Sequence, residues 1–240
     1  MLAYAFTIGV DLVDAVARTD LVGLLCIAVL IGLSIVSLYF MLAKFFEIRD
    51  ADAQSREFIE DCMEGHKSLP EIYRSAKHYP DSPLAALLRE AYLEYELEIH
   101  TDSLATLPLQ ERVALGKTSV ESALERTIAA EMRKLEHRLV ILATASSIAP
   151  FIGLFGTVWG VLGAFQALGR EGSAALTALA PGISTALTTT VFGLLVAIPA
   201  AAMYNYLSGN VSRLSSQMDS FAHELSNVFQ KHLLKKGLSE

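Results

Sequence analysis

The sequence predicts an all-α membrane protein with three transmembrane helices and long cytoplasmic helical extensions. Three stretches contain no Asp, Glu, Lys or Arg, namely residues 21–43, 139–169 and 172–212. Each is long enough to cross a hydrocarbon core of about 30 Å, which takes about 20 apolar residues in a helix. The composition agrees, because 52% of the 240 residues are hydrophobic and only 19% are charged, against about 25% in a typical soluble domain.

Charge and cysteine content exclude several other classes of protein. The formal net charge is −7, so a nucleic-acid-binding surface is not expected. The two cysteines are Cys26, in an apolar run, and Cys62, in a charged region, so no disulfide framework is expected. The first basic residue is Arg18. With no basic region ahead of it, the apolar run at residues 21–43 is predicted to be an uncleaved anchor.

Residues 1–20 and 21–43 form the first two predicted segments. Residues 1–20 carry apolar side chains at near-helical spacing, which predicts a periplasmic N-terminal segment with a short helix on the membrane surface. Residues 21–43 are rich in Leu, Ile and Val, as expected of a lipid-facing transmembrane helix.

The distribution of Lys and Arg predicts the orientation in the membrane. Residues 44–138 and the tail after residue 206 hold 17 of these residues, whereas the remaining segments hold only Arg18 and Arg170. Basic residues favour the cytoplasmic side. The N-terminus is therefore predicted to be periplasmic and the C-terminus cytoplasmic.

The two cytoplasmic segments have helical patterns. Residues 44–138 are predicted to be a helical domain divided by prolines, and apolar residues from Val113 to Leu139 recur at helical spacing. That spacing predicts an amphipathic helix that runs without a break into the second span. Residues 207–240 form a C-terminal helix with a heptad seam from Leu207 to His232. The seam fits a bundle within one subunit and packing between subunits equally well.

The second and third spans carry stripes of small residues. We place the second span at 139–169, a short periplasmic loop at 170–181 with Pro181 near the next helix's first turn, and the third span at 182–206. Small residues allow close contact between membrane helices, which lipid alone does not drive together. The predicted helix-packing residues are Gly153, Gly156, Gly160, Gly163, Gly182, Ala186 and Gly193.

Threonine hydroxyls lie beside these stripes. Thr157 is in the second span, and Thr185, Thr189 and Thr190 are in the third. Threonines in membrane helices commonly bond to their own backbone or join helices; alternatively, these line a polar path. Neither span contains an Asp, Glu, Lys, Arg or His, and hydroxyls do not titrate near neutral pH. If the chain conducts protons, another chain must supply the carboxylate.

No pattern of an enzyme or a cofactor site is present in the sequence. The six histidines have no metal-ligand spacing with a cysteine. There is also no phosphate-binding glycine loop and no nucleophile elbow. We therefore expect neither an enzyme nor a bound metal or cofactor.

The second span reads APFIGLFGTVWGVLGAF from Ala149, and the third reads APGISTALTTTVFGLLVAIPAAAMYN from Ala180. These motifs resemble the TolQ/ExbB/MotA family of bacterial inner-membrane proton-channel subunits, and are most similar to TolQ and ExbB. The resemblance covers about 65 residues strongly. Flagellar MotA-type subunits have four spans and fit less well.

The resemblance implies a homo-oligomeric, pentameric ring around a dimer of a single-span partner like TolR or ExbD, which carries the membrane Asp. The transported ion would be H⁺. By motif position, Thr157 and Thr190 correspond to the family's pore-facing threonines, and we assign Thr185 and Thr189 to the same pathway. Proton entry would then do work on the outer membrane or at the cell surface.

One position departs from the family pattern. Thr185 stands where TolQ and ExbB usually have Glu, in APGI-Ser-Thr-Ala-Leu. This leaves the partner's Asp as the only expected proton carrier. The downstream process remains open between Tol-Pal function, TonB-type transport and gliding motility. The alternative function is a non-conducting membrane scaffold for partner assembly.

Overall fold

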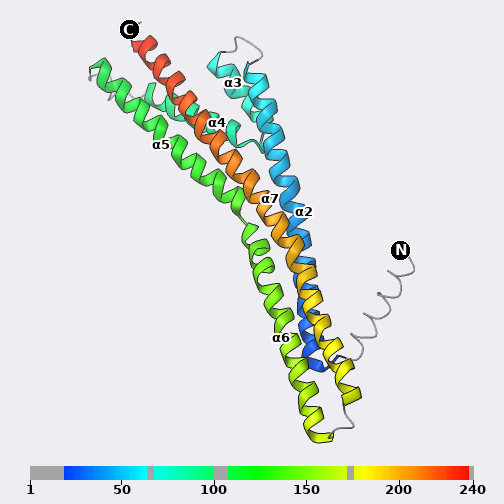
Figure 1. The fold of residues 1–240 in the computed structure, drawn as a ribbon. Helices are drawn as coiled ribbons and strands as arrows, with labels where there is room; N and C mark the ends of the chain where they lie inside the picture. The colour runs from blue at the N-terminus through cyan, green and yellow to red at the C-terminus, as the bar shows by residue number, and fades with distance from the viewer. Residues whose placement is uncertain (1–18, 64–67, 100–107, 172–175, 238–240) are drawn as a thin grey trace. The chain divides into compact units, whose positions relative to one another are not determined.

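The computed structural model describes residues 19–63, 68–99, 108–171 and 176–237, and every regular element in these ranges is helical. The prediction of an all-α chain is confirmed. The elements are α2 (Leu21–Met63), α3 (Leu69–Ser75), the short 3₁₀ helix η1 (Ala76–His78), α4 (Pro83–Ile99), α5 (Leu109–Glu136), α6 (Leu139–Glu171) and α7 (Leu176–Gly237), as labelled in Figure 1. The helix predicted within residues 1–20 lies outside the described residues.

Three helices, α2, α6 and α7, are long and apolar enough to cross a membrane. The charge-free stretches predicted three such helices. Two of them also extend well past their apolar parts, because α2 has 43 residues and α7 has 62. A hydrocarbon core takes about 20 helical residues, so a membrane span would account for only part of either helix.

The chain divides into two compact units. The membrane unit comprises residues 1–44 and 138–206, and the extension unit comprises residues 45–137 and 207–240. In the membrane unit, Leu30, Ala149, Val196 and Ala197 form a buried apolar cluster. Large apolar side chains are exposed on all three of its helices. Exposure in the single chain therefore does not distinguish the first span as the one that faces lipid.

The predicted continuous helix from α5 into the second span is wrong. α5 ends at Glu136, and α6 begins at Leu139. Between them, His137 has ψ 130° and Arg138 has φ 72°. These angles leave the right-handed helical region. Neither glycine nor proline marks this break, which explains why apolar spacing alone did not predict it.

The predicted loop at residues 170–181 is largely helical instead. α6 continues to Glu171 and α7 already begins at Leu176, so Pro181 lies in the second turn of α7. Residues 172–175 of this loop lie outside the described part of the chain. The earlier start is consistent with the Ala and Leu content of residues 176–180, since both have high helix propensity.

Prolines stand at helix starts in the extension unit. Pro70 is the second residue of α3, Pro83 is the first of α4, and Pro108 caps α5. Proline is tolerated there because the first turn of a helix needs no backbone N–H donor. A capping box also starts α3, since the Ser68 N–H donates to Glu71 Oε2 over 2.8 Å.

The C-terminal part of α7 packs within its own chain. Leu207, Val211, Leu214, Met218 and Leu225 of the predicted seam are buried. Val228 is 38% exposed, however, and His232 is exposed. Phe229, which lies outside the seam, is buried instead, with its ring centroid 5.1 Å from that of Tyr95. A helix of 3.6 residues per turn drifts away from a strict heptad, so the buried face moves off the seam. The buried part of the seam thus packs within its own chain, as the first of the two alternatives expects.

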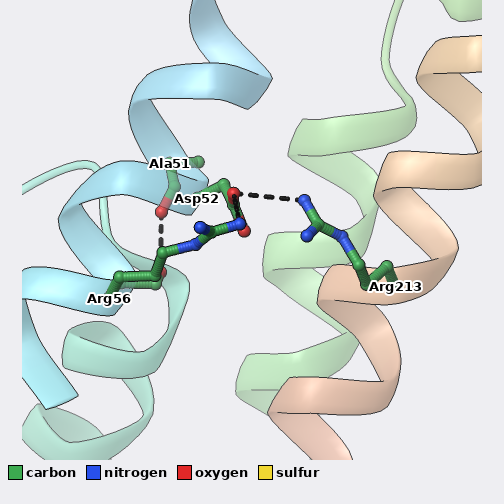
Figure 2. A network of polar contacts seen from close by, with 5 residues as sticks. Ala51, Asp52, Arg56 and Arg213 are labelled. Atoms are coloured by element: carbon green, nitrogen blue, oxygen red, sulfur yellow. Dashed lines mark hydrogen bonds and ion pairs between the residues drawn. The ribbon is translucent and has the colours of Figure 1, made fainter.

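A polar network joins α2 to α7 within the extension unit (Figure 2). Asp52 Oδ2 lies 2.8 Å from the Arg56 guanidinium and 3.1 Å from that of Arg213. The Asp52 side chain is only 16% exposed. Two guanidinium groups therefore offset the charge of one largely buried carboxylate.

Candidate functional site

Glycines of α6 allow the backbone of α7 to come close. A Cβ built on Gly153 would lie 2.9 Å from the Thr189 carbonyl oxygen and 3.0 Å from Thr190 Cα. A Cβ on Gly160 would lie 2.8 Å from Ala186 Cβ. Side chains at these two positions would force the helices apart, so the close contact depends on the small residues. Figure 1 shows α6 beside the N-terminal part of α7.

The remaining predicted packing residues occupy different environments. A Cβ on Gly193 would lie 2.7 Å from the Ala149 carbonyl oxygen, and one on Gly182 would lie 3.1 Å from Ala164 Cβ. Gly156 faces the Thr189 side chain, with Thr189 Oγ1 2.7 Å from its built Cβ. Gly163 has no heavy atom of the described chain within 4 Å of such a Cβ. The stripe therefore forms the α6–α7 contact at all the predicted positions except Gly163.

Three of the four predicted pathway threonines meet at this contact. Thr157 Oγ1, on α6, is within hydrogen-bond distance of Thr190 Oγ1 and lies 3.3 Å from Thr189 Oγ1, both on α7. Its other acceptors are the carbonyl oxygens of Gly153 and Ala186, each 3.1 Å away. We call these three hydroxyls and two carbonyls the hydroxyl cluster.

The two hydroxyls of α7 use the same carbonyl groups. Thr189 Oγ1 donates to Ala186 over 2.8 Å or to Gly153 over 3.0 Å. Thr190 Oγ1 lies 3.2 Å from the Gly153 oxygen. Thr189 is 0% exposed, whereas Thr157 and Thr190 are half-buried. The cluster therefore has one fully buried threonine and two that are half-buried in the single chain.

The fourth threonine, Thr185, is separate from this group. Its hydroxyl donates to the Gly182 carbonyl over 2.9 Å. The neighbouring Thr188 hydroxyl likewise donates to the Ser184 carbonyl over 3.1 Å. Both are bonds of a side chain to the preceding turn of its own helix.

Sequence reasoning missed the role of the two carbonyl groups. Gly153 and Ala186 were predicted only as packing residues, yet their oxygens are the acceptors about which the three threonines gather. The available signal was the helical spacing: Thr157 follows Gly153 by four residues, and Thr189 follows Ala186 by three. At these distances a threonine can bond the carbonyl of the preceding turn.

The hydroxyl cluster can bind a proton donor or acceptor but cannot itself hold a charge. Each hydroxyl has one proton and two lone pairs, and the three hydroxyls and two carbonyls together offer more acceptor sites than donors. No Asp, Glu, Lys, Arg or His occurs in residues 139–169 or 182–206. A charge passing this point would therefore need a titratable group from elsewhere.

The comparisons with known proteins cover the hydroxyl cluster. The sequence pattern of the MotA/TolQ/ExbB proton channel family matches residues 96–220. The biopolymer transport protein ExbB of Neisseria gonorrhoeae is 31% identical over 185 residues, which are 76% of this chain and 79% of that protein. The Tol-Pal system protein TolQ of Haemophilus influenzae is 29% identical over 235 residues, which are 96% and 99% of the two chains. A second ExbB, from Pseudomonas putida, is 32% identical over 212 residues, 87% of this chain and 61% of its own.

Proposed function

We propose, because this chain belongs to the MotA/TolQ/ExbB proton channel family, that it is the ring-forming subunit of an inner-membrane motor driven by the proton-motive force. In this proposal it conducts protons together with a partner and passes the energy to the outer membrane or the cell surface. The match to the family includes the whole hydroxyl cluster. The two relatives named for biopolymer transport and for the Tol-Pal system support an energy-transducing role.

The partner in this proposal supplies the titratable group. A dimer of a single-span protein of the TolR or ExbD type would place its membrane Asp inside a ring of five copies of this chain. Support comes from the chemistry of the second and third spans, which hold threonine hydroxyls and no Asp, Glu, Lys, Arg or His. A proton path across a bilayer usually needs ionisable groups.

Thr157 and Thr190 would be the groups that meet this Asp. The observation that carries the proposal is that their hydroxyls, on different helices, bond to each other while both side chains remain half-buried. Such a pair can donate to the ionised carboxylate and accept from the protonated acid. Thr185 would lie beside the pathway, at the position where the family usually has Glu.

The orientation follows the Lys and Arg asymmetry, with the N-terminus in the periplasm and the C-terminus in the cytoplasm. A proton that moves from the periplasm to the cytoplasm across a potential of 100 mV releases about 2.3 kcal/mol. A few protons per step would suffice to rearrange several packing contacts. Tol-Pal function, TonB-type transport and gliding motility are the downstream processes that such a motor could drive.

The test removes one hydroxyl at a time and keeps the side-chain shape. Thr157→Val and Thr190→Val are each expressed with the single-span partner, and the complex is reconstituted in vesicles that contain a pH-sensitive dye. We expect proton flux per complex to fall about tenfold or more, because a hydrogen bond to a charged group contributes about 1.5–3 kcal/mol. Thr188→Val is the matched control, since the Thr188 hydroxyl bonds only its own helix. Unchanged flux in both test variants would contradict the proposal.

A non-conducting scaffold is the second candidate function. It is favoured by the observation that all three hydroxyls of the cluster have acceptors within the chain, as expected of threonines that only join helices. In that case Gly160→Leu would prevent assembly, because Gly160 faces Ala186 closely. The valine variants would then retain the full activity of the partner system in cells.

A further inference from the structure

Thr189 differs from the other two hydroxyls of the cluster by its burial. It is 0% exposed, and its hydroxyl lies between the carbonyl oxygens of Ala186 and Gly153, at 2.8 and 3.0 Å. α2 covers it from another side, since a Cβ on Gly23 would lie 3.9 Å from Thr189 Cγ2. A side chain enclosed in this way does not contact a group that approaches from the surface of the chain.

Gly156 provides the space for this side chain. A Cβ at Gly156 would lie 2.7 Å from Thr189 Oγ1 and 2.9 Å from Thr189 Cβ. Contacts below 3.0 Å essentially never occur for real Cβ atoms. Any residue larger than glycine would therefore displace the Thr189 hydroxyl from the two carbonyls, which links the glycine stripe directly to the hydroxyl cluster.

The numbers of hydrogen-bond donors and acceptors in the cluster indicate the role of Thr189. Three hydroxyls compete for the Gly153 and Ala186 carbonyl oxygens, each of which has only two lone pairs and also serves the helix backbone. A Thr189 hydroxyl that donates to one of these carbonyls keeps its own lone pairs, and Thr157 Oγ1 lies 3.3 Å away. Thr157 then has an acceptor other than the backbone, and its hydroxyl is less strongly held by the carbonyls.

We propose that Thr189 is a positioning residue, whose hydroxyl occupies one of the two carbonyls, that of Ala186 or that of Gly153, and so leaves the Thr157 and Thr190 hydroxyls more available to a proton carrier that approaches the half-buried side of the cluster. This rests on the proposed function. It assigns Thr189 an indirect role in place of the pore-lining one expected for it from the sequence. The proton carrier meets Thr157 and Thr190, and Thr189 acts through them.

The experiment separates the effect of the Thr189 hydroxyl group from the effect of the side chain's shape. Thr189→Val keeps the two-branched side chain and loses the hydroxyl, whereas Thr189→Ser keeps the hydroxyl and loses the methyl group. Each is purified as the full chain in complex with its single-span partner. Proton flux per complex is measured in phosphatidylethanolamine–phosphatidylglycerol vesicles, and the thermal midpoint and assembled mass are measured on the same samples.

We expect flux to follow the hydroxyl: about three- to tenfold lower in Thr189→Val, the effect of one net hydrogen bond, and within twofold of the parent in Thr189→Ser. Thr188→Val, one residue away and also buried, is expected to leave flux unchanged. The inference is overturned if Thr189→Val has the same proton flux as the parent, if Thr189→Ser has a flux as low as Thr189→Val, or if Thr188→Val lowers the flux equally.

Failure of this inference can be distinguished from failure of the proposed function. Thr157→Val and Thr190→Val are measured in parallel. Loss of flux in these two with full flux in Thr189→Val overturns only the positioning role. Full flux in all three variants, or a parent complex that conducts no protons, overturns the proposed function as well. Thr189→Val could also lower the thermal midpoint or the assembled mass while Thr189→Ser does not. In that case, proton flux per intact complex is compared between Thr189→Val and the parent, and equal flux overturns the positioning role.

Discussion

Gly153 contributes to the membrane unit in two ways. Its missing side chain lets the backbone of α7 approach, and its carbonyl oxygen lies within 3.0–3.2 Å of three hydroxyls, those of Thr157, Thr189 and Thr190. A carbonyl has two lone pairs and one of them already serves the helix. The three hydroxyls therefore cannot all donate to the Gly153 oxygen at once, and they also have each other and the Ala186 oxygen as acceptors.

Arg138 is the only non-glycine residue with a positive φ in the described chain, at 72°. A side chain in the left-handed region costs about 1–2 kcal/mol because Cβ approaches the following carbonyl. The Arg138 guanidinium lies over the Phe40 ring, 5.7 Å from its centroid. This cation–π contact offsets part of the backbone cost, typically by about 0.5–1 kcal/mol at an exposed site.

The positive φ of Arg138 predicts that glycine is more stable than alanine at this position, and the opposite order is predicted at a helical control position. Arg138→Gly and Arg138→Ala both lose the cation–π contact, but only alanine keeps a Cβ in the left-handed region. We expect the glycine variant to be more stable by about 1 kcal/mol. At Arg133, within α5, the order should reverse, because glycine costs about 1 kcal/mol relative to alanine inside a helix. Thermal unfolding in detergent measures both pairs, and the same order at both positions would contradict the prediction.

At the scale of helices, α6 and α7 pack through small residues rather than large ones. Many large apolar side chains of these helices are exposed, among them Phe151, Phe155, Leu195 and Ile198. Within lipid there is no hydrophobic gain from turning them inward, so close backbone approach stabilises the pair instead. The same close approach brings the threonines of both helices within bonding distance.

Alanine substitutions test this helix contact position by position. Gly153→Ala should lower the free energy of unfolding by about 1–3 kcal/mol, since its new methyl group would lie 2.9 Å from a backbone oxygen that cannot move away easily. Gly163→Ala should be neutral or stabilising in the single chain, because its Cβ meets open space and alanine is the better helix former. Unfolding of the detergent-solubilised chain in denaturant compares the two. Equal losses at both positions would show that the contact does not depend on the local fit.

At the scale of the whole molecule, the membrane unit has a polar cluster without a charge carrier. Residues 139–169 and 182–206 contain no Asp, Glu, Lys, Arg or His, and the buried Lys44 directly follows the first charge-free stretch, residues 21–43. A proton therefore has no titratable site at the hydroxyl cluster in this chain alone. If protons pass the cluster, as proposed, the acidic group has to come from another chain.

The chain reconstituted by itself should leave a pH difference across vesicles intact, because no group of the cluster can take up a proton near neutral pH. Vesicles with the chain and its single-span partner should lose the difference. The partner's membrane Asp replaced by Asn should restore the barrier, and an entrapped pH-sensitive dye reports all three conditions. Dissipation by the chain alone would contradict the dependence on a partner.

The amino-acid sequence by itself determined the all-α class, the three helices long and apolar enough to cross a membrane and the residue types at their contact. The reason is that each charged or polar residue placed in a bilayer costs free energy by itself. A run without charges and a stripe of glycines can therefore be recognised from the sequence, without the tertiary structure. The motifs from Ala149 and Ala180 likewise sufficed to identify the family, which the similarity to known ExbB and TolQ proteins confirms.

Only the tertiary structure decided which hydroxyls meet. Thr188, Thr189 and Thr190 are consecutive, yet Thr188 bonds only its own helix, Thr189 is fully buried, and Thr190 is half-buried and bonds Thr157. The break at His137 and Arg138 and the drift of the buried face to Phe229 were also decided there. Neighbours on a helix differ by about 100° in direction, and their surroundings depend on segments distant in the chain. Local spacing cannot specify them.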